Sequence, residues 1–222
     1  MVDKNPQKIQ QMFNKIASKY DLINDTISFF THRAVKVYAI KALKIQPCSR
    51  ILDLCCGSGD LGRIVKKICP NCEVIGVDFS SKMLDIAKSK TKEITYLEQD
   101  ATQLEIESNS FDYVVMGFGL RNIENRKASL LEIYRVLKDE GKFLQLDFGE
   151  KNLVNKIYDV ITRLIMRNLG IDKECTGYLI DSKNEFPLPS LLVKEFEEIG
   201  FNVIELKKKL FSMISYQIMK KV

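Results

Sequence analysis

The residues with the clearest chemical potential lie in one stretch, Arg50–Gly62, which reads RILDLCCGSGDLG. Its apolar run, Ile51–Cys55, predicts a buried strand, the turn Gly57–Gly59 follows, and a helix is expected from about Asp60. Glycines let a backbone come close to a ligand, and the first turn of a helix offers unpaired N–H groups. The stretch therefore predicts a nucleotide-binding corner.

Two classes of ligand use such a corner. Gly57, Gly59 and Gly62, with an acidic residue further on at Asp78, satisfy the fingerprint of dinucleotide-binding proteins. However, Asp53 lies inside the predicted strand, where a buried parallel strand is normally apolar. Asp53 followed by x-x-x-G-x-G resembles the first motif of class I S-adenosylmethionine-dependent methyltransferases. This resemblance favours a methyltransferase and leaves a NAD-binding oxidoreductase as the alternative.

The ends of the next strands supply further ligand-binding candidates. Asp78 ends the predicted strand Glu73–Asp78, from which a carboxylate can accept hydrogen bonds from ribose hydroxyls. Asp100 follows the strand Ile94–Leu97 and is expected to accept a hydrogen bond from the adenine amino group. Phe79 and Met83 are expected to flank the adenine ring, and Gly117 ends the fourth strand. The candidate cofactor-binding residues are Asp53, Gly57, Ser58, Gly59, Asp78, Phe79, Met83, Asp100, Ala101 and Gly117.

Composition narrows the class of protein. The chain of 222 residues is 45% hydrophobic, which suits one domain with a full core. We find no apolar run of membrane-spanning length and no secretion signal, so we expect a cytoplasmic protein. Of its net charge of +5, residues 1–50 carry +6, so the basic excess lies in the N-terminal segment. That segment fits a nucleic acid, an anionic membrane surface or, by default, a solvated helix face.

Six cysteines occur without the spacing of a disulfide framework, and we expect them to be thiols. Cys69 and Cys72 form a C-x-x-C pair that is expected to lie in a turn. With no second pair and a single histidine, no metal site is predicted.

Hydrophobic periodicity predicts an α/β fold: a Rossmann-like, seven-stranded, mostly parallel sheet. Two final strands, Phe201–Leu206 and Phe211–Met219, are expected to form an antiparallel hairpin with a short lysine turn. The residues Ala17–Arg33 lack periodicity and are rich in polar and aromatic groups, which suits either a substrate lid or a plain connector. The segment Asn152–Leu169 is amphipathic, and we expect it to pack on the sheet, to close a pocket or to rest on anionic lipid. Its apolar face contains Leu153, Ile157, Ile161, Leu164 and Ile165, and its basic face contains Lys156, Arg163 and Arg167. We expect one methyltransferase domain, comprising an N-terminal helical lid (1–47), a cofactor-binding core (48–149), a helical insertion (150–190) and a C-terminal helix with the hairpin (191–222).

The loop Gly117–Asn122, which leaves the fourth strand, is expected to lie opposite the transferable methyl group. It has neither the Asn/Asp-Pro-Pro motif that implies methylation of exocyclic amines nor the Pro-Cys of pyrimidine methylation, so nucleic-acid bases are disfavoured as substrates. Phe118–Asn122 (FGLRN), Phe13–Asp25 (FNKIASKYDLIND), Leu52–Asp60 and Tyr134–Lys138 together resemble the C-methyltransferases of menaquinone and ubiquinone biosynthesis. The chain departs from that family at Phe30, Val35 and 139–141, which affects the expected shape of the substrate pocket.

The resemblance implies methyl transfer from S-adenosyl-L-methionine to a ring carbon of a prenylated quinol, either demethylmenaquinol or the benzoquinol of the ubiquinone pathway. It implies that Arg121 and Asn122 hold the quinol oxygens, that His32 accepts a proton and that Tyr20 assists, although His32 also suits a structural role at a helix start. Peripheral contact with the inner membrane surface is expected, nucleic acid is not an expected partner, and the sequence leaves a homodimer open. Another small-molecule methyltransferase or an RNA methyltransferase remains an alternative.

Overall fold

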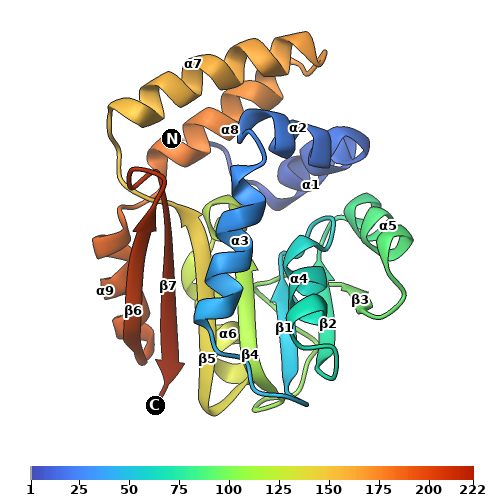
Figure 1. Ribbon diagram of the computed structural model, residues 1–222, viewed down its shortest axis with the longest axis vertical. Coiled ribbons are helices and arrows are strands. Elements are labelled where there is room, and N and C mark those ends of the chain that lie inside the picture. Colours follow the sequence, from blue (N-terminus) through green and yellow to red (C-terminus); the bar gives the residue numbers. More distant parts are fainter. Residues whose placement is uncertain (1) are drawn as a thin grey trace.

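The computed structural model describes residues 2–222 and contains one sheet of seven strands in the order β3-β2-β1-β4-β5-β7-β6 (Figure 1). Strands β1 to β5 are parallel, whereas β7 runs antiparallel to both β5 and β6. This arrangement confirms the predicted mostly parallel sheet with an antiparallel C-terminal hairpin. The strands are β1 (Arg50–Leu54), β2 (Glu73–Asp78), β3 (Thr95–Glu98), β4 (Phe111–Gly117), β5 (Leu137–Phe148), β6 (Phe201–Lys209) and β7 (Ile214–Lys221).

Helices cover both faces of this sheet and one of its ends. The helical elements are α1 (Pro6–Ile16), η1 (Ala17–Lys19), α2 (Tyr20–Ile27), α3 (Thr31–Ala42), α4 (Asp60–Ile68), α5 (Ser81–Lys90), η2 (Leu120–Asn122), α6 (Arg126–Val136), α7 (Leu153–Asn168), α8 (Lys173–Glu185) and α9 (Pro189–Ile199). One face packs against α3 and α4, and the opposite face packs against α6 and α9. Alternate residues of β1 and β4 therefore point into two separate apolar cores, as expected of a strand that is buried on both faces.

The elements α1, α2, α7 and α8 form a separate layer beyond the carboxyl ends of the parallel strands (Figure 1). Ile16, Ile23, Met166 and Cys175 form the buried core of this layer. Ligands of open α/β sheets bind at the carboxyl ends of the strands, so this layer stands over the expected site.

Two helices in this layer differ from the sequence prediction. The segment Ala17–Arg33, which was expected to be irregular, contains η1, α2 and the start of α3. In α2, Ile23 packs in the layer core while Tyr20 and Asn24 line a cavity, so polar residues lie on the inward face and obscure the periodicity. Helix α8 was not predicted, because its polar composition gives only weak periodicity.

Three local predictions were wrong. Strand β5 begins at Leu137 rather than Lys142, because buried Leu137 pairs with Phe111 before a shift in register. The lysines Lys207–Lys209 belong to β6, and the hairpin turns at Leu210–Met213 instead. Cys69 and Cys72 form a disulfide between α4 and β2 instead of remaining thiols.

Candidate active site

The glycine corner connects β1 to α4 and is tied to the neighbouring strand. Gly57 and Gly59 have φ values of +53° and +79°, a region that favours glycine. The Gly57 N–H donates a hydrogen bond to Asp78 Oδ2 at 2.8 Å, and the Ser80 N–H donates to Asp78 Oδ1 at 2.9 Å. Asp78 therefore fixes the glycine turn and the start of α5 together.

Asp53, the unusual acid within β1, lies beneath this corner. Its Oδ2 accepts a hydrogen bond at 2.8 Å from the N–H of Gly62, in the first turn of α4, where backbone donors lack helical partners. Burial raises the pKa of Asp53 to about 7, and the Gly62 hydrogen bond partly opposes that rise. Asp53 thus anchors the helix that follows the ligand-binding turn.

Asp60, at the N-terminus of α4, is neutralised by two cations. Lys36 Nζ lies 2.9 Å from Asp60 Oδ2, and Arg63 Nη2 lies 2.5 Å from Asp60 Oδ1. Burial opposes ionisation of Asp60, but Lys36 and Arg63 hold its pKa well below the usual range. Asp60 is therefore ionised, and its charge is balanced by two cations of the chain itself.

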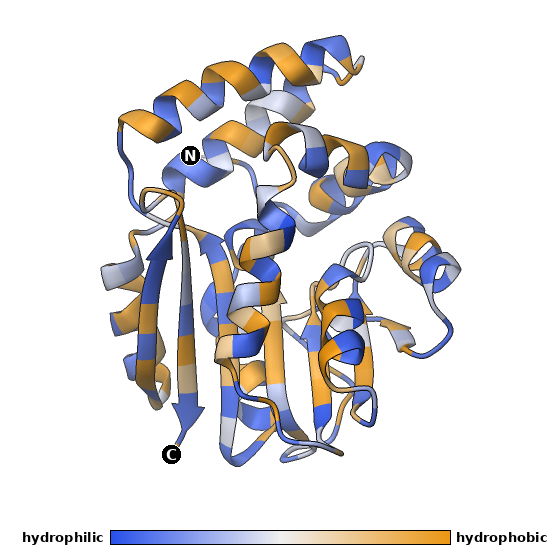
Figure 2. Cartoon of the chain, in the orientation of Figure 1, coloured by the Kyte–Doolittle hydropathy of each residue, from blue (hydrophilic) through white to orange (hydrophobic). Residues whose placement is uncertain are grey.

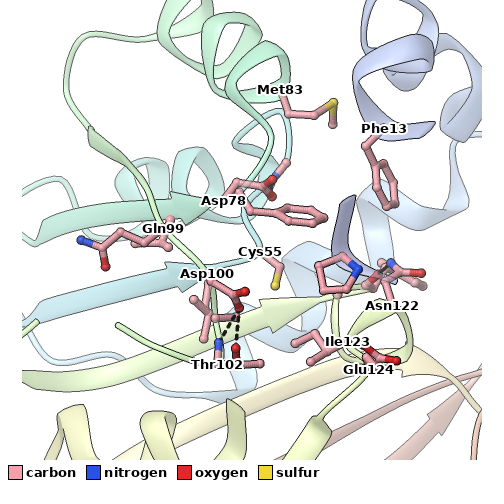
Figure 3. Close-up of a pocket in the computed structure, with 18 of the residues that line it drawn as sticks. Phe13, Cys55, Asp78, Met83, Gln99, Asp100, Thr102, Asn122, Ile123 and Glu124 are labelled. Atoms are coloured by element: carbon pink, nitrogen blue, oxygen red, sulfur yellow. Dashed lines mark hydrogen bonds between the residues drawn. The ribbon is translucent and has the colours of Figure 1, made fainter. Parts of the chain in front are cut away.

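A first cavity opens at the ends of β1, β2, β3 and β4 (Figure 3). The predicted cofactor residues that line it are Gly57, Asp78, Phe79, Met83, Asp100, Ala101 and Gly117. Asp78 is buried, and this burial raises its pKa to about 6. Asp100 Oδ1 is held at 2.8 Å by both the N–H and the hydroxyl of Thr102, which leaves Oδ2 without a bond from that turn.

The remaining predicted cofactor residues lie outside the first cavity. The Ser58 hydroxyl donates to Asp21 Oδ1 at 2.7 Å and lines a second cavity. Gly59 lines neither cavity, and a Cβ at its position would meet the Tyr96 hydroxyl at 2.5 Å. Gly59 therefore serves the conformation and packing of the turn.

This second cavity lies beneath the helical layer and adjoins the first. Phe13, Tyr20, Cys55, Gly57, Gly117 and Phe118 line both cavities. The second cavity also contains Arg121 and His32, whereas Asn122 lines the first. Of the predicted reactive residues, Tyr20 thus lies where the two cavities join, with Arg121 and His32 in one cavity and Asn122 in the other.

Arg121 is buried, and its guanidinium lies near two aromatic rings, at 5.9 Å from the Phe118 centroid and 5.3 Å from the Phe148 centroid. Its Nη1 donates to the Phe118 carbonyl at 2.5 Å and to Asp147 Oδ1 at 3.2 Å. Burial raises the pKa of Asp147, and the charge of Arg121 opposes that rise. Within the described residues, the buried atoms Arg121 Nε and Asp147 Oδ2 have no hydrogen-bond partner.

His32 is buried at the start of α3, and its Nε2 lies 2.8 Å from Asp25 Oδ1. Arg33 holds the pKa of Asp25 down to about 2, so Asp25 is ionised and Nε2 must carry the proton. Burial and the charge of Lys36 lower the pKa of His32. The histidine is therefore neutral near pH 7, with Nδ1 available as a proton acceptor.

The structure adds functional candidates that sequence reasoning missed. The Tyr178 hydroxyl, on the unpredicted α8, donates to Asn122 Oδ1 at 3.0 Å and so fixes the orientation of the Asn122 amide. Lys183 and Asp159 form a nearly buried ion pair in the second cavity, between α8 and α7. Asp172 caps α8 by accepting from Cys175 N, and this acidic cap after Gly170 was the available signal for the helix.

The fold is that of methyltransferases of known structure. A chain of the complex between the Haloferax volcanii Trm112 methyltransferase activator and its methyltransferase superposes with a TM-score of 0.71 at 16% identity, covering 94% of this chain and 96% of that one. A SAM-dependent methyltransferase from Aquifex aeolicus superposes with a TM-score of 0.64 at 15% identity, covering 84% and 89%. These similarities define the class by its fold.

Sequence comparison then defines the family. Residues 1–221 match the model of the ubiE/COQ5 methyltransferase family. A demethylmenaquinone methyltransferase of Staphylococcus haemolyticus is 35% identical, covering 93% of this chain and 92% of its own, and one of Listeria welshimeri is 33% identical, covering 92% of each. The chain belongs to the ubiE/COQ5 methyltransferase family, which confirms the resemblance found in the sequence and supports S-adenosyl-L-methionine as its methyl donor.

Proposed function

We propose that this protein transfers a methyl group from S-adenosyl-L-methionine to a ring carbon of a polyprenyl quinol, with demethylmenaquinol as the substrate. The observation that best supports this proposal is that two cavities meet at Tyr20, Cys55, Gly57 and Gly117. The first cavity is lined by expected cofactor residues and the second by Arg121 and His32. The names of the Staphylococcus and Listeria relatives support this choice of quinol.

The residues of the first cavity suit the cofactor. Each Asp78 oxygen accepts one backbone N–H and keeps acceptor capacity for a ribose hydroxyl, while Asp100 Oδ2 suits the adenine amino group. Phe79, Met83 and Ala101 supply the surface against which the adenine ring packs. When bound, the cofactor supplies an electrophilic methyl group.

The residues of the second cavity suit the activation of a quinol. A ring carbon becomes nucleophilic as the neighbouring phenol loses its proton, so the protein must orient the ring, stabilise the phenolate and accept protons. The guanidinium of Arg121, which lines the second cavity, can donate a hydrogen bond to a phenolate oxygen, and Asn122, oriented by Tyr178, can hold a quinol oxygen on the side of the first cavity. Neutral His32 accepts a proton at Nδ1, and Tyr20, at the cavity junction, assists in orienting the ring.

The substrate class also sets the location that we propose, which is the cytoplasm with peripheral contact at the inner face of the membrane. A polyprenyl quinol resides in lipid, whereas the described residues contain no helix that is long and apolar enough to cross a bilayer. In this proposal residues 1–47 act as a lid and 150–190 as an insertion, and together they enclose the prenyl tail above the sheet.

The test is incubation of the purified protein with S-adenosylmethionine and a reduced short-chain demethylmenaquinol, followed by measurement of S-adenosylhomocysteine and product mass. We expect stoichiometric S-adenosylhomocysteine and a product heavier by one methyl group, and at least a hundredfold loss of kcat in Arg121→Ala, an order of magnitude typical of losing one stabilising donor. Binding of cofactor without methylation of any quinol would refute the proposal.

A further inference from the structure

The outward face of α7 is apolar although nothing in the described chain covers it. Leu153, Val154, Ile157, Val160 and Leu164 are exposed by 37–70% and recur at helical spacing along this face, which we call the α7 outer face. The inward residues Asn155, Thr162 and Met166 are buried. Figure 2 shows apolar residues recurring along α7 at the end of the molecule that carries the helical layer. The predicted packing of this helix through Leu153, Ile157 and Leu164 is therefore wrong, because these side chains point away from the protein.

Two loop tips also expose aromatic side chains. Phe29 and Phe30, between α2 and α3, are 68% and 64% exposed, and Phe211, at the tip of the β6–β7 hairpin, is 84% exposed. All three have positive φ, at +48°, +61° and +54°, a region that disfavours bulky residues. Strained backbone that presents aromatic rings to solvent points to a functional use of those rings.

The same three segments line the second cavity from within. Ser28 and Thr31 flank the first tip, and Leu210 and Met213 flank the second. The inward side of α7 contributes Tyr158 and Thr162 to the cavity. Asn152, at the start of α7, donates to the Phe211 carbonyl at 2.8 Å, which joins the hairpin tip to the helix. The three segments that carry exposed apolar side chains therefore also line the proposed quinol site.

The charge around this surface is positive. Lys151, Lys156, Arg163 and Arg167 are exposed, and none of them forms an ion pair within residues 2–222. The acidic side chains of this segment are already paired, Asp159 with Lys183 and Glu150 with Lys208. Unpaired cations beside exposed apolar side chains complement a bilayer that contains anionic headgroups.

We propose that the α7 outer face, with Phe29, Phe30 and Phe211, docks on an anionic lipid bilayer, so that a polyprenyl quinol enters the second cavity directly from the membrane. The apolar side chains insert among the acyl chains while the lysines and arginines contact the headgroups. The inference rests on the proposed quinol substrate for its purpose, but binding to lipid is measurable without any quinol.

The test measures binding of the intact protein to vesicles of pure phosphatidylcholine and to vesicles of equal parts phosphatidylcholine and phosphatidylglycerol. We expect binding to the anionic vesicles that weakens with salt, and at least about tenfold weaker binding for Ile157→Ser/Val160→Ser, because two apolar side chains lose their burial in lipid. Lys156→Gln/Arg163→Gln should weaken binding to the anionic vesicles alone. Leu131→Ser/Leu191→Ser, which alters comparably exposed residues on α6 and α9, is the matched control and should bind like the parent protein.

Two further readouts separate this inference from the proposed function. Ile157→Ser/Val160→Ser should keep its circular dichroism, its affinity for S-adenosylhomocysteine and its rate on a short-chain quinol in detergent, while losing about tenfold in rate on a long-chain quinol in vesicles. Absence of binding to anionic vesicles, or equal binding by the serine variant, would overturn the docking surface while leaving the methylation result intact. A dimer in sedimentation that Ile157→Ser/Val160→Ser dissociates, without vesicle binding, would assign the face to a second copy of the chain and also overturn the proposal.

Discussion

Replacing Arg121 by methionine should destabilise the protein through Asp147. Methionine retains an apolar stem between Phe118 and Phe148, but it leaves the carboxylate of Asp147 fully buried without its cation. Removing one partner of a buried ion pair costs about 3–5 kcal/mol. At roughly 2–4 °C per kcal/mol for a chain of this size, the Tm of Arg121→Met should fall by about 6–20 °C.

A second change should restore stability without restoring activity. In Arg121→Met/Asp147→Asn neither position of the former pair carries a charge, and we expect the free energy of unfolding to return to within about 2 kcal/mol of the parent value, because a neutral replacement of a buried pair is often tolerated. The rate of methylation should stay at least about a hundredfold low, since the guanidinium donor is still absent.

The pH dependence of stability gives an independent test for an uncompensated buried charge on Asp147. Burial raises the pKa of Asp147, and the Arg121→Met variant lacks the main cation that opposes that rise. A carboxyl whose folded-state pKa exceeds its unfolded value stabilises the protein at low pH and loses this contribution as the pH rises through the folded value. The Tm of Arg121→Met relative to the parent should therefore fall as pH increases above about 4, whereas the double variant should show no such trend.

Thermal unfolding from pH 4 to pH 8, with steady-state rates on a short-chain quinol, measures both effects. If Arg121→Met is as stable as the double variant at every pH, then Asp147 is not an uncompensated buried charge and the reasoning is refuted. If the double variant regains full activity, Arg121 has no part in catalysis.

Three other predictions follow from the site. Gly57→Ala should weaken S-adenosylhomocysteine binding by about tenfold in calorimetry, because φ is +53° and the new Cβ would meet Met83 at 3.3 Å; unchanged affinity would contradict the role of the turn. Burial raises the pKa of Asp78 to about 6, and binding of the ribose hydroxyls needs the ionised form, so the affinity for S-adenosylhomocysteine should fall as the pH drops through about 6. Asp78→Asn should bind S-adenosylhomocysteine weakly at every pH. If the affinity of the parent protein is also constant from pH 5 to pH 8, Asp78 does not bind the ribose as proposed. Lys183→Met should lower Tm by several degrees by leaving Asp159 without its cation, and Lys183→Met/Asp159→Leu should recover most of the loss; equal Tm values for Lys183→Met and the parent protein would show that this pair adds no stability.

The sequence predicted the sheet well because the evidence for it was local. The strands Glu73–Asp78 and Phe111–Gly117 were bounded correctly, since each mainly apolar run ends at an acidic residue or a glycine that marks the turn after the strand. The turn at Gly57 was also predictable, because a strand, a glycine pair and an amphipathic helix follow one another without interruption.

Helix α2 of the helical layer was harder to predict because both of its faces are occupied. In α2 the apolar face packs in the layer and the polar face lines the cavity, so the segment lacks the pattern of a helix exposed to water. Side-chain partners were also hidden, because Asp147 and Arg121 are brought together by a contact between a strand and a distant loop that no spacing reveals. Likewise, the Lys183–Asp159 pair depends on the antiparallel packing of α7 and α8.

The most direct test of the proposed reaction is to locate the transferred methyl group. S-adenosylmethionine labelled with carbon-13 in the methyl group would be incubated with the protein and reduced demethylmenaquinol, and the product examined by carbon NMR. The proposed mechanism predicts one labelled methyl group bonded to a ring carbon, with none on oxygen. A methyl group on a phenolic oxygen, or label in no quinol product, would contradict C-methylation by this protein.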